Sequence, residues 1–333
     1  MKPDKTAAQQ ELLFNRLVKR YRHLKKWARR TGTNAYRLYD RDIPEIPLVL
    51  DLYDDSVSGA LYRRPYEKDE KTETIWLLEM KKTISRALEI PAENIFLKER
   101  RRMRNRQNSG DQYNKFSGKS FYRDVREGDL LYRVNLSDYL DSGLFLDARK
   151  KRALLYANAG GRRVLNLFAY TCSLSVAAAR GGASRVDSVD LSKTYLDWGK
   201  LNFSLNGLDT SGNRAGIGRT GVYNFIQSDV LKFLANTEKN KSRWDIIILD
   251  PPGFSNSKRM ENNLDIKRDY RDLIQSCLRL LEPGGSLWFS SNARGFKFRQ
   301  DDFPGLDIKD MGKELLDEDF KGKKNPVCYK FGG

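Results

Sequence analysis

Three aspartates each follow a strand-like segment in the second half of the sequence, where side chains from different strands can act together. Asp190 ends the segment VDSVD, Asp229 follows NFIQS, and Asp250 follows WDIIIL. A carboxylate at the end of a strand can accept hydrogen bonds from both hydroxyls of a ribose, which is the use we expect for Asp190. Asp229 suits the exocyclic amine of adenine, which donates a hydrogen bond. These two residues therefore predict a site for a nucleoside.

Asp250 opens the sequence D-P-P-G-F, which is the most specific signal in the chain. Pro251 and Pro252 fix the backbone angle φ and lack an N–H group, so the turn is rigid. Its carbonyls and the carboxylate can accept hydrogen bonds from a base, and Phe254 can stack on that base. A simple turn after a strand is the structural alternative. Because two other carboxylates also follow strands, we favour a catalytic pocket for a base taken out of its helix, formed by these four residues.

The segments that must position these residues alternate between strand-like and helix-like patterns. Such alternation predicts a parallel sheet with helices on both faces, in which ligands bind beyond the carboxyl ends of the strands. No G-x-G-x-x-G sequence follows the first strand, which argues against a dinucleotide-dependent oxidoreductase. The expected strands are 163–168, 185–189, 225–227, 245–249 and 286–290, and the expected helices are 174–180, 193–206, 230–236 and 266–281.

The first part of the chain predicts a small α+β domain over residues 1–137, followed by the α/β domain over 138–333. Residues 46–53 and 57–62 resemble a pair of strands, residues 72–89 a helix with Thr72 as its N-cap, and residues 94–98 and 120–136 further strands. Residues 10–30 predict an amphipathic helix whose apolar face contains Leu13, Leu17, Leu24 and Trp27. Cations crowd its other faces: Arg16, Lys19, Arg20, Arg22, Lys25, Lys26, Arg29 and Arg30.

Positive charge is the dominant feature of the composition, with a formal net charge of +17 and a pI near 9.6. Such a charge attracts polyanions, and we predict that the basic helix contacts an RNA backbone, with a solvated surface as the alternative. The arginine-rich stretch from residue 100 is too polar to pack. We expect it to bind phosphates, with simple disorder as the alternative. The cations assigned to RNA are Arg20, Lys26, Arg30, Arg100, Arg101, Arg102, Arg104, Lys258, Arg259 and Arg294.

Several classes of site are disfavoured by composition. Three cysteines lie far apart and there is one histidine, so we expect neither a metal site nor a histidine-dependent triad. The chain has no apolar run of the length that spans a membrane, and no signal-peptide core at its start. These features favour a cytoplasmic protein in a reducing compartment.

The chain resembles the bacterial 23S rRNA guanine-N7 methyltransferase family, which consists of class I (Rossmann-like) S-adenosylmethionine-dependent enzymes. Its members occur alone or as the C-terminal half of a fused guanine N2/N7 enzyme. The resemblance covers residues 14 to 296 and lies in the segments FNRLVKRYRHLKKWARRTGTNAYRLYDRDIPE, NLSDYLDSGLFLDARK, LNLFAYTCSLSVAAARGGA, VDLSKTYLDWGKLNFSLNGL, DPPGFSNSKRM and FSSNARGF.

The resemblance implies S-adenosylmethionine as cofactor, S-adenosylhomocysteine as its product, and an RNA-binding N-terminal domain. The substrate it implies is 23S rRNA or its large-subunit precursor, at the equivalent of guanine 2069 in helix 74, with a separate guanine-N2 methyltransferase as a possible neighbour. Arg149 would pair with the carboxylate of the cofactor. The cofactor residues implied or predicted are Asp147, Arg149, Asn166, Phe168, Tyr170, Thr171, Asp190, Leu191, Ser192, Asp229, Val230 and Asp250.

The sequence departs from the family at two places that bear on activity. Cys172 stands where the family usually has glycine, which permits a close approach of backbone. The C-terminal end, NPVCYKFGG, keeps only a trace of the family's final strand, and residues 209–222 form a longer insertion than usual. A non-catalytic RNA-binding assembly factor therefore stays open as an alternative.

The methyl acceptor is also left with alternatives by the residues. Guanine N7 carries a free lone pair, so orientation alone can drive the transfer. Cytosine C5 requires a cysteine nucleophile, but Ser290-Ser291-Asn292 stands where a related family has Ser-Cys-Ser, and we expect Cys277 in a helix core. An exocyclic amine stays open, because D-P-P-x-F resembles the motif of amine-methylating enzymes.

Overall fold

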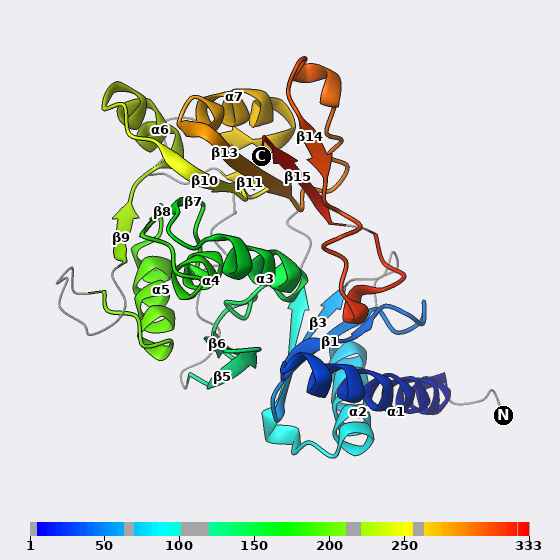
Figure 1. Ribbon diagram of the computed structural model, residues 1–333. Helices are drawn as coiled ribbons and strands as arrows, with labels where there is room; N and C mark the ends of the chain where they lie inside the picture. Colours follow the sequence, from blue (N-terminus) through cyan, green and yellow to red (C-terminus); the bar gives the residue numbers. More distant parts are fainter. Residues whose placement is uncertain are drawn as a thin grey trace. The chain divides into compact units, whose positions relative to one another are not determined.

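The computed structural model describes residues 5–62, 70–100, 120–210, 221–255, 263–324 and 326–332. Its contacts divide the chain into two units (Figure 1). The first contains Met1–Leu146 and Glu318–Phe320, and the second contains Asp147–Asp317 and Lys321–Gly333. The main boundary thus falls somewhat later than the sequence boundary at 137/138, and a short C-terminal segment joins the first unit.

The first unit is a four-stranded sheet with two helices and a separate hairpin. The sheet has the order β1-β2-β3-β4, in which the first two pairs are antiparallel and β3 and β4 are parallel. The apolar face of α1, with Leu13, Leu17, Leu24 and Trp27, lies in the core against α2 and the sheet. The elements are α1 (Lys5–Thr31), β1 (Ala35–Asp40), β2 (Leu48–Tyr53), β3 (Ser56–Tyr62), α2 (Glu70–Leu88), β4 (Ile95–Arg100), β5 (Tyr122–Glu127) and β6 (Leu130–Asn135).

The sequence predicted most of this unit. The basic helix, the strand pair β2 and β3, the following helix, β4 and the short strands β5 and β6 are confirmed. Thr72 as a helix N-cap is wrong, because Glu70 and Lys71 are already helical and Thr72 lies inside α2. Strand β1 was not predicted.

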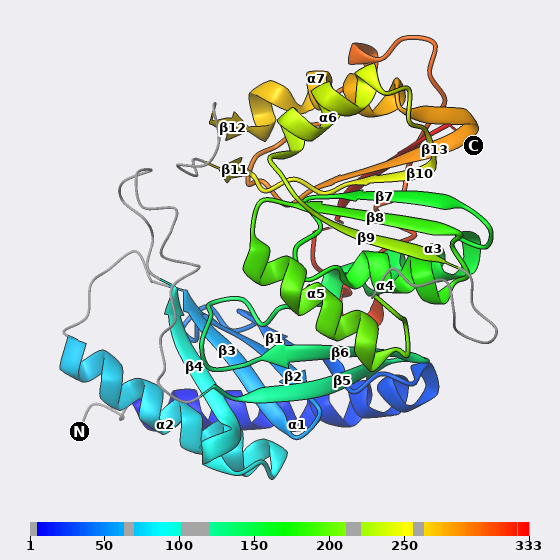
Figure 2. The same ribbon diagram turned by 90° about the vertical axis from the view of Figure 1, so that its left-hand side faces the viewer.

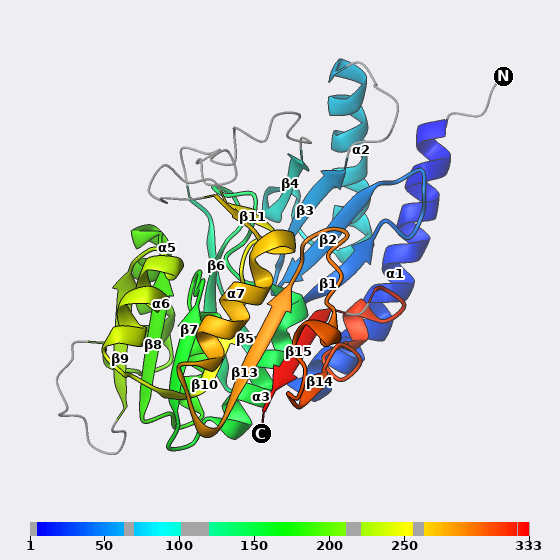
Figure 3. The same cartoon turned by 90° about the horizontal axis from the view of Figure 1, so that it is seen from above.

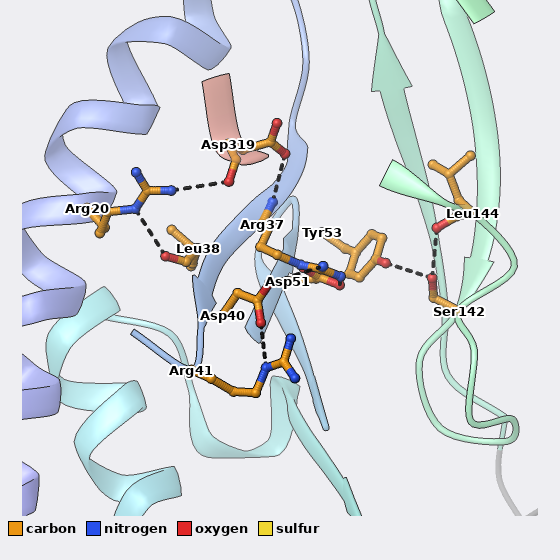
Figure 4. A network of polar contacts seen from close by, with 10 residues as sticks. All are labelled: Arg20, Arg37, Leu38, Asp40, Arg41, Asp51, Tyr53, Ser142, Leu144 and Asp319. Atoms are coloured by element: carbon orange, nitrogen blue, oxygen red, sulfur yellow. Dashed lines mark hydrogen bonds and ion pairs between the residues drawn. The ribbon is translucent and has the colours of Figure 1, made fainter. Parts of the chain in front are cut away.

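The segment Glu318–Phe320 is fixed within the first unit by a polar network (Figure 4). The Asp319 carboxylate accepts a hydrogen bond from the backbone N–H of Arg37 at 3.0 Å, and its carbonyl accepts one from the Arg20 guanidinium at 3.3 Å. Arg37 also pairs with Asp51 at 2.8 Å and lies 4.8 Å from the centre of the Phe320 ring. Because Asp319 is buried, these contacts replace the water that it loses on folding.

The second unit is a seven-stranded sheet with helices on both faces. Its order is β14-β15-β13-β10-β7-β8-β9, which Figure 3 shows from one edge to the other. Strands β13, β10, β7, β8 and β9 run parallel, and β15 is antiparallel to both β13 and β14. Helices α3, α4 and α5 cover one face, whereas α6 and α7 cover the other (Figure 2).

The helices and strands of the second unit begin and end as follows: α3 (Arg149–Asn158), β7 (Arg163–Leu167), α4 (Ser173–Arg180), β8 (Arg185–Asp190), α5 (Lys193–Leu205), β9 (Val222–Gln227), α6 (Val230–Lys239), β10 (Trp244–Leu249), β11 (Phe254–Ser255), β12 (Leu264–Asp265), α7 (Ile266–Leu278), β13 (Leu281–Ser291), β14 (Ile308–Asp310) and β15 (Val327–Phe331).

The predicted α/β class, with a Rossmann-like sheet in the second part of the chain, is confirmed. The expectation of only a trace of a final strand is wrong, since β15 pairs with β13 from Leu287↔Phe331 to Ser291↔Val327. Cys328 and Phe331 lie three residues apart, so their side chains point to opposite faces of the strand, and both are buried. Helix α3 and strands β11, β12 and β14 were not predicted.

Candidate functional site

Four neighbouring parallel strands bring the predicted site residues to one edge of the sheet. Asp250 directly follows β10, the loop 168–172 follows β7, Asp190 ends β8, and Asp229 comes two residues after β9. Since β10, β7, β8 and β9 are adjacent in this order and run parallel, their carboxyl ends lie at the same edge. The three carboxylates and the loop are therefore neighbours along that edge, as the sequence predicted.

Asp190 connects two of these strand ends. One carboxylate oxygen accepts a hydrogen bond from the backbone N–H of Tyr170 at 2.8 Å, and the other accepts one from Ser192 at 2.8 Å. Desolvation by burial raises the pKa of Asp190, against the lowering effect of these N–H groups. Each oxygen has a second lone pair, so the carboxylate can fix the loop and still accept hydroxyl hydrogens from a ligand.

The loop after β7 has an unusual backbone. Phe168, Tyr170 and Cys172 have φ angles of 56°, 52° and 60°, in the left-handed region that favours glycine. Each such residue costs about 1–2 kcal/mol, and backbone strain of this kind concentrates at ligand sites. The angle at Cys172 also explains in physical terms why glycine suits this position. Leu191 and Ser192 continue the same edge after β8, and Thr171 is buried within the loop.

Asn166 places an unsatisfied acceptor at the end of β7. Its side chain is 1% exposed, and its Nδ2 donates to Ser175 Oγ at 2.9 Å. Its Oδ1 has no hydrogen-bond partner within the part of the chain that the structure describes. A buried acceptor without a partner costs free energy, so a donor on a bound molecule would stabilise this position. With Asp190 and the strained loop, it forms a donor and acceptor set that fits a nucleoside.

Asp229 caps the N-terminus of helix α6. Its Oδ1 accepts hydrogen bonds from the backbone N–H groups of Leu231 at 2.7 Å and Lys232 at 3.4 Å, which makes it the N-cap of α6. The sequence predicted a ligand contact and missed this capping, although an aspartate just before a helix is the usual signal for it. Its second oxygen can still accept from a ligand. The next residue, Val230, is buried.

Asp250 of the D-P-P-G-F turn is paired with a lysine that sequence reasoning did not single out. Lys151 Nζ lies 2.7 Å from Asp250 Oδ2 and 2.7 Å from Ser290 Oγ. Desolvation alone would lower the pKa of Lys151, but the charge of Asp250 and the hydrogen bond to it raise that pKa overall. Pro251 is buried, whereas Phe254 is 37% exposed and can meet an incoming base.

The two residues implied near the methionine end of a cofactor differ in their surroundings. Asp147 is exposed, whereas Arg149 is buried and pairs with Asp317 at 2.9 Å. The guanidinium expected to meet a ligand carboxylate therefore already has an acidic partner. Phe168 and Tyr170 are half-buried, and the Tyr170 ring packs edge-on against Tyr195.

The cations predicted to bind RNA fall into four groups. Lys26 and Arg30 are exposed on α1, and Arg294 is exposed after β13. Arg20 is half-buried and donates to the backbone carbonyls of Leu38 and Asp319, which is a structural use. Arg100 ends β4. Residues Arg101, Arg102, Arg104, Lys258 and Arg259 lie outside the described residues.

The ranges that the structure describes offer neither a metal site nor a membrane-spanning helix. They contain no cluster of three or more residues suited to a metal ion. None of the helices among them has both the length and the apolar character needed to cross a bilayer.

The known proteins that resemble this chain are methyltransferases. A family model described as S-adenosylmethionine-dependent methyltransferase matches residues 48–300. A ribosomal RNA large subunit methyltransferase K from Neisseria meningitidis is 40% identical over 318 residues, covering 95% of this chain and 85% of that protein. A ribosomal RNA large subunit methyltransferase K/L from Allochromatium vinosum is 39% identical over 330 residues. The alignment covers 98% of this chain but only 43% of that longer protein.

Solved structures share the fold. A protein described as a SAM-dependent methyltransferase from Streptococcus mutans aligns with a TM-score of 0.73 and 23% identity, over 97% of this chain and 81% of that one. The structure of SMU.776 with bound S-adenosylhomocysteine aligns with a TM-score of 0.72 and 23% identity, over 97% and 82%.

Proposed function

The chain belongs to the S-adenosylmethionine-dependent methyltransferase family, and from that premise we propose that it methylates a guanine of 23S ribosomal RNA at N7. The observation that carries the proposal is the shared sheet edge, where Asp190, Asn166 and the strained loop adjoin the Asp250–Phe254 turn. The names of the Neisseria and Allochromatium relatives support large-subunit rRNA as the substrate.

The chain's own residues would hold the cofactor along this edge. Asp190 would accept from ribose hydroxyls, the buried Oδ1 of Asn166 would accept from a further donor, and the second oxygen of Asp229 would accept from the adenine amine. The cofactor supplies a methyl group on a positively charged sulfur, which is a reactive electrophile with a neutral leaving group. The protein therefore contributes mainly orientation.

The D-P-P-G-F turn would receive the target base. Asp250 offers an acceptor for N–H groups of the base, and the exposed ring of Phe254 offers a stacking surface. Guanine N7 needs no deprotonation before it attacks a methyl group, so the turn has to place the base and need not remove a proton. Asp147 and Arg149 would complete the methionine end, with Arg149 shared between a ligand carboxylate and Asp317.

The cysteines argue against methylation at cytosine C5. All three are free and buried, at Cys172, Cys277 and Cys328. Burial raises the pKa of each thiol, in the case of Cys328 to about 11. A thiolate nucleophile is therefore scarce at neutral pH. An amine acceptor and guanine N7 both fit the turn, and we favour N7 because it needs no base.

Exposed cations on α1 would bind the RNA backbone. Lys26 and Arg30 belong to this group, and neither is involved in an ion pair shown by the structure among the described residues. Such contacts add affinity that is independent of sequence and weakens with salt. We expect Arg294 to act in the same way beside the target base, and we extend the prediction to Arg100, Arg101, Arg102, Arg104, Lys258 and Arg259 on sequence grounds.

Methyl transfer from tritiated cofactor to unmodified 23S rRNA tests the proposal. We expect label at one guanine, at a position that becomes sensitive to the strand cleavage specific for N7-methylguanine. The variant Asp190→Ala should lose transfer. Asp197→Asn should retain it, because the Asp197 side chain on α5 is 46% exposed and its ion pairs within the described ranges are with the surface residues Lys193 and Lys200. Label on an exocyclic amine or on cytosine C5 would reject N7. No heat on titration with S-adenosylhomocysteine would favour an assembly factor.

A further inference from the structure

The ion pair between Lys151 and Asp250 is unusual for its position in the fold. Lys151 lies in the first turn of α3, where no acidic residue occurs and where the helix dipole disfavours a cation. Its side chain is only 6% exposed, so the ammonium has also lost its water. Both effects oppose a charged lysine at this place. Asp250 and Ser290 offset them with two hydrogen bonds of 2.7 Å.

The partners of Lys151 come from strands that are far apart in the sequence but adjacent in the sheet. Asp250 follows β10, and Ser290 lies in β13, which pairs with β10 on one side and β15 on the other. Lys151 therefore joins helix α3 to two strand ends at the edge that holds the D-P-P-G-F turn. A lysine is disfavoured both in the first turn of a helix and in a buried position. Because Lys151 combines the two at a proposed site, we infer a functional constraint on this residue.

Asp250 is more accessible than its partner. Its side chain is 35% exposed, and the hydrogen bond from Lys151 occupies only Oδ2. The other oxygen can accept from a donor that enters the site. The Watson–Crick edge of guanine presents two N–H donors, at N1 and N2, whereas adenine presents an acceptor at N1. A carboxylate held in place by a buried ammonium, with one oxygen left to accept, therefore suits guanine better than adenine.

We propose that Lys151 is a positioning residue: its buried ammonium fixes the Asp250 carboxylate so that one oxygen stays free to accept from the target guanine. This inference rests on the proposed function, because it concerns the same base site. Lys151 does not touch the substrate itself and acts through Asp250. Removal of the ammonium lets the carboxylate rotate, and misplacement of a reacting group by about 1 Å can lower the rate by about 100-fold.

Kinetics of methyl transfer to 23S rRNA test the inference with three variants. Lys151→Met should lower kcat by about 10- to 100-fold and change the KM for RNA and the affinity for S-adenosylhomocysteine by less than about threefold. Lys151→Arg keeps the positive charge and should recover part of that loss. The matched control is Lys150→Met, because Lys150 precedes Lys151 in α3 and donates to the carbonyl of Leu316 instead of to Asp250. It should have the kcat of the wild type.

A double variant shows whether Lys151 acts through Asp250. If it does, Asp250→Asn and Lys151→Met/Asp250→Asn should have the same kcat within about threefold, because the second change removes nothing further. The double variant also lacks an uncompensated buried charge, so it stays informative if Lys151→Met alone unfolds.

The outcomes separate the two proposals. Wild-type protein without activity on 23S rRNA contradicts the proposed function, and this inference with it. Active wild type together with a fully active Lys151→Met overturns the inference alone, as do losses that multiply in the double variant.

Discussion

Gly199 and Cys172 should depend on each other, because α5 passes close to the strained loop at this point. A methyl group built on Gly199 would lie 2.5 Å from Cys172 Sγ and 2.9 Å from Cys172 Cβ. The next neighbour, Phe225, lies at an ordinary contact distance of 3.5 Å. The variant Gly199→Ala therefore tests one steric contact, between helix α5 and the loop of the proposed cofactor site.

The expected free energies of unfolding follow from these contacts. In the wild-type background, overpacking by Gly199→Ala costs about 1–3 kcal/mol, and the better helix propensity of alanine offsets about 1 kcal/mol. Cys172→Gly relieves a left-handed φ of 60°, a gain of about 1–2 kcal/mol, but loses buried apolar surface worth about as much. That variant alone should be nearly neutral.

The double variant should reverse the sign of the Gly199 change. Without the thiol, the alanine methyl can occupy the space that sulfur filled, and the helix-propensity gain of about 1 kcal/mol is realised. The coupling between the two sites should therefore be about 1–3 kcal/mol.

Urea unfolding of the four proteins, followed by circular dichroism at one pH, measures this coupling. Gly207→Ala is a control for the steric contact, because Gly207, which has a φ of 65°, has no neighbour within 4 Å of a built methyl group. It should cost the same in both backgrounds. A coupling below about 0.5 kcal/mol between Gly199 and Cys172 would refute the reasoning, since independent sites add within that margin.

Three further predictions concern the first unit. Desolvation by burial lowers the pKa of Lys98 to about 8. In the unfolded chain the pKa of Lys98 is about 10.4. Burial of the charged ammonium therefore destabilises the folded state below about pH 8, and this destabilisation disappears as pH rises from about 8 to about 10.4. Lys98→Met should therefore gain stability over the wild type at pH 7.5 and lose that advantage near pH 10, and a difference independent of pH would contradict this. Asp319→Ala leaves the backbone N–H of Arg37 without its acceptor and should cost about 1–3 kcal/mol in urea unfolding, whereas Asp319→Asn should cost less; equal losses would argue against this hydrogen bond. Lys26→Ala/Arg30→Ala should reduce the slope of log affinity for rRNA against log salt by roughly 1.4 to 1.8, in filter binding at several salt concentrations, and leave the affinity for S-adenosylhomocysteine unchanged; an unchanged slope would remove α1 from the RNA surface.

The sheet of the second unit was predictable because its strands carry strong local signals. The run Ile246–Leu249 in β10 is apolar throughout and buried, as expected for a strand covered on both faces. Polar residues directly after such runs had to lie at one edge, and this placed Asp190 and Asp250 without any structure. Helix α3 lacked such a signal, because its sequence RKKRALLYAN begins with four cations of which three are buried.

Contacts between residues far apart in the sequence could not be predicted from it. Lys151 and Asp250 are 99 residues apart, and Arg37 and Asp319 are 282 residues apart. Neither spacing follows from helix or strand periodicity. Long-range contacts of this kind depend on which elements become neighbours in the fold, and a sequence pattern predicts residues within an element better than contacts between elements.

Asp190 has a structural use that its place in the sequence does not reveal. The sequence assigned its two oxygens to a ribose, but in the structure each oxygen already accepts a backbone N–H, from Tyr170 and from Ser192. The first of these bonds holds a residue whose φ is left-handed, between two others of the same kind. The carboxylate therefore stabilises the strained loop. The shape of the proposed cofactor site follows from that loop as much as from the carboxylate, and for this reason the neighbouring Cys172, with no expected ligand contact, should still influence the geometry of the site.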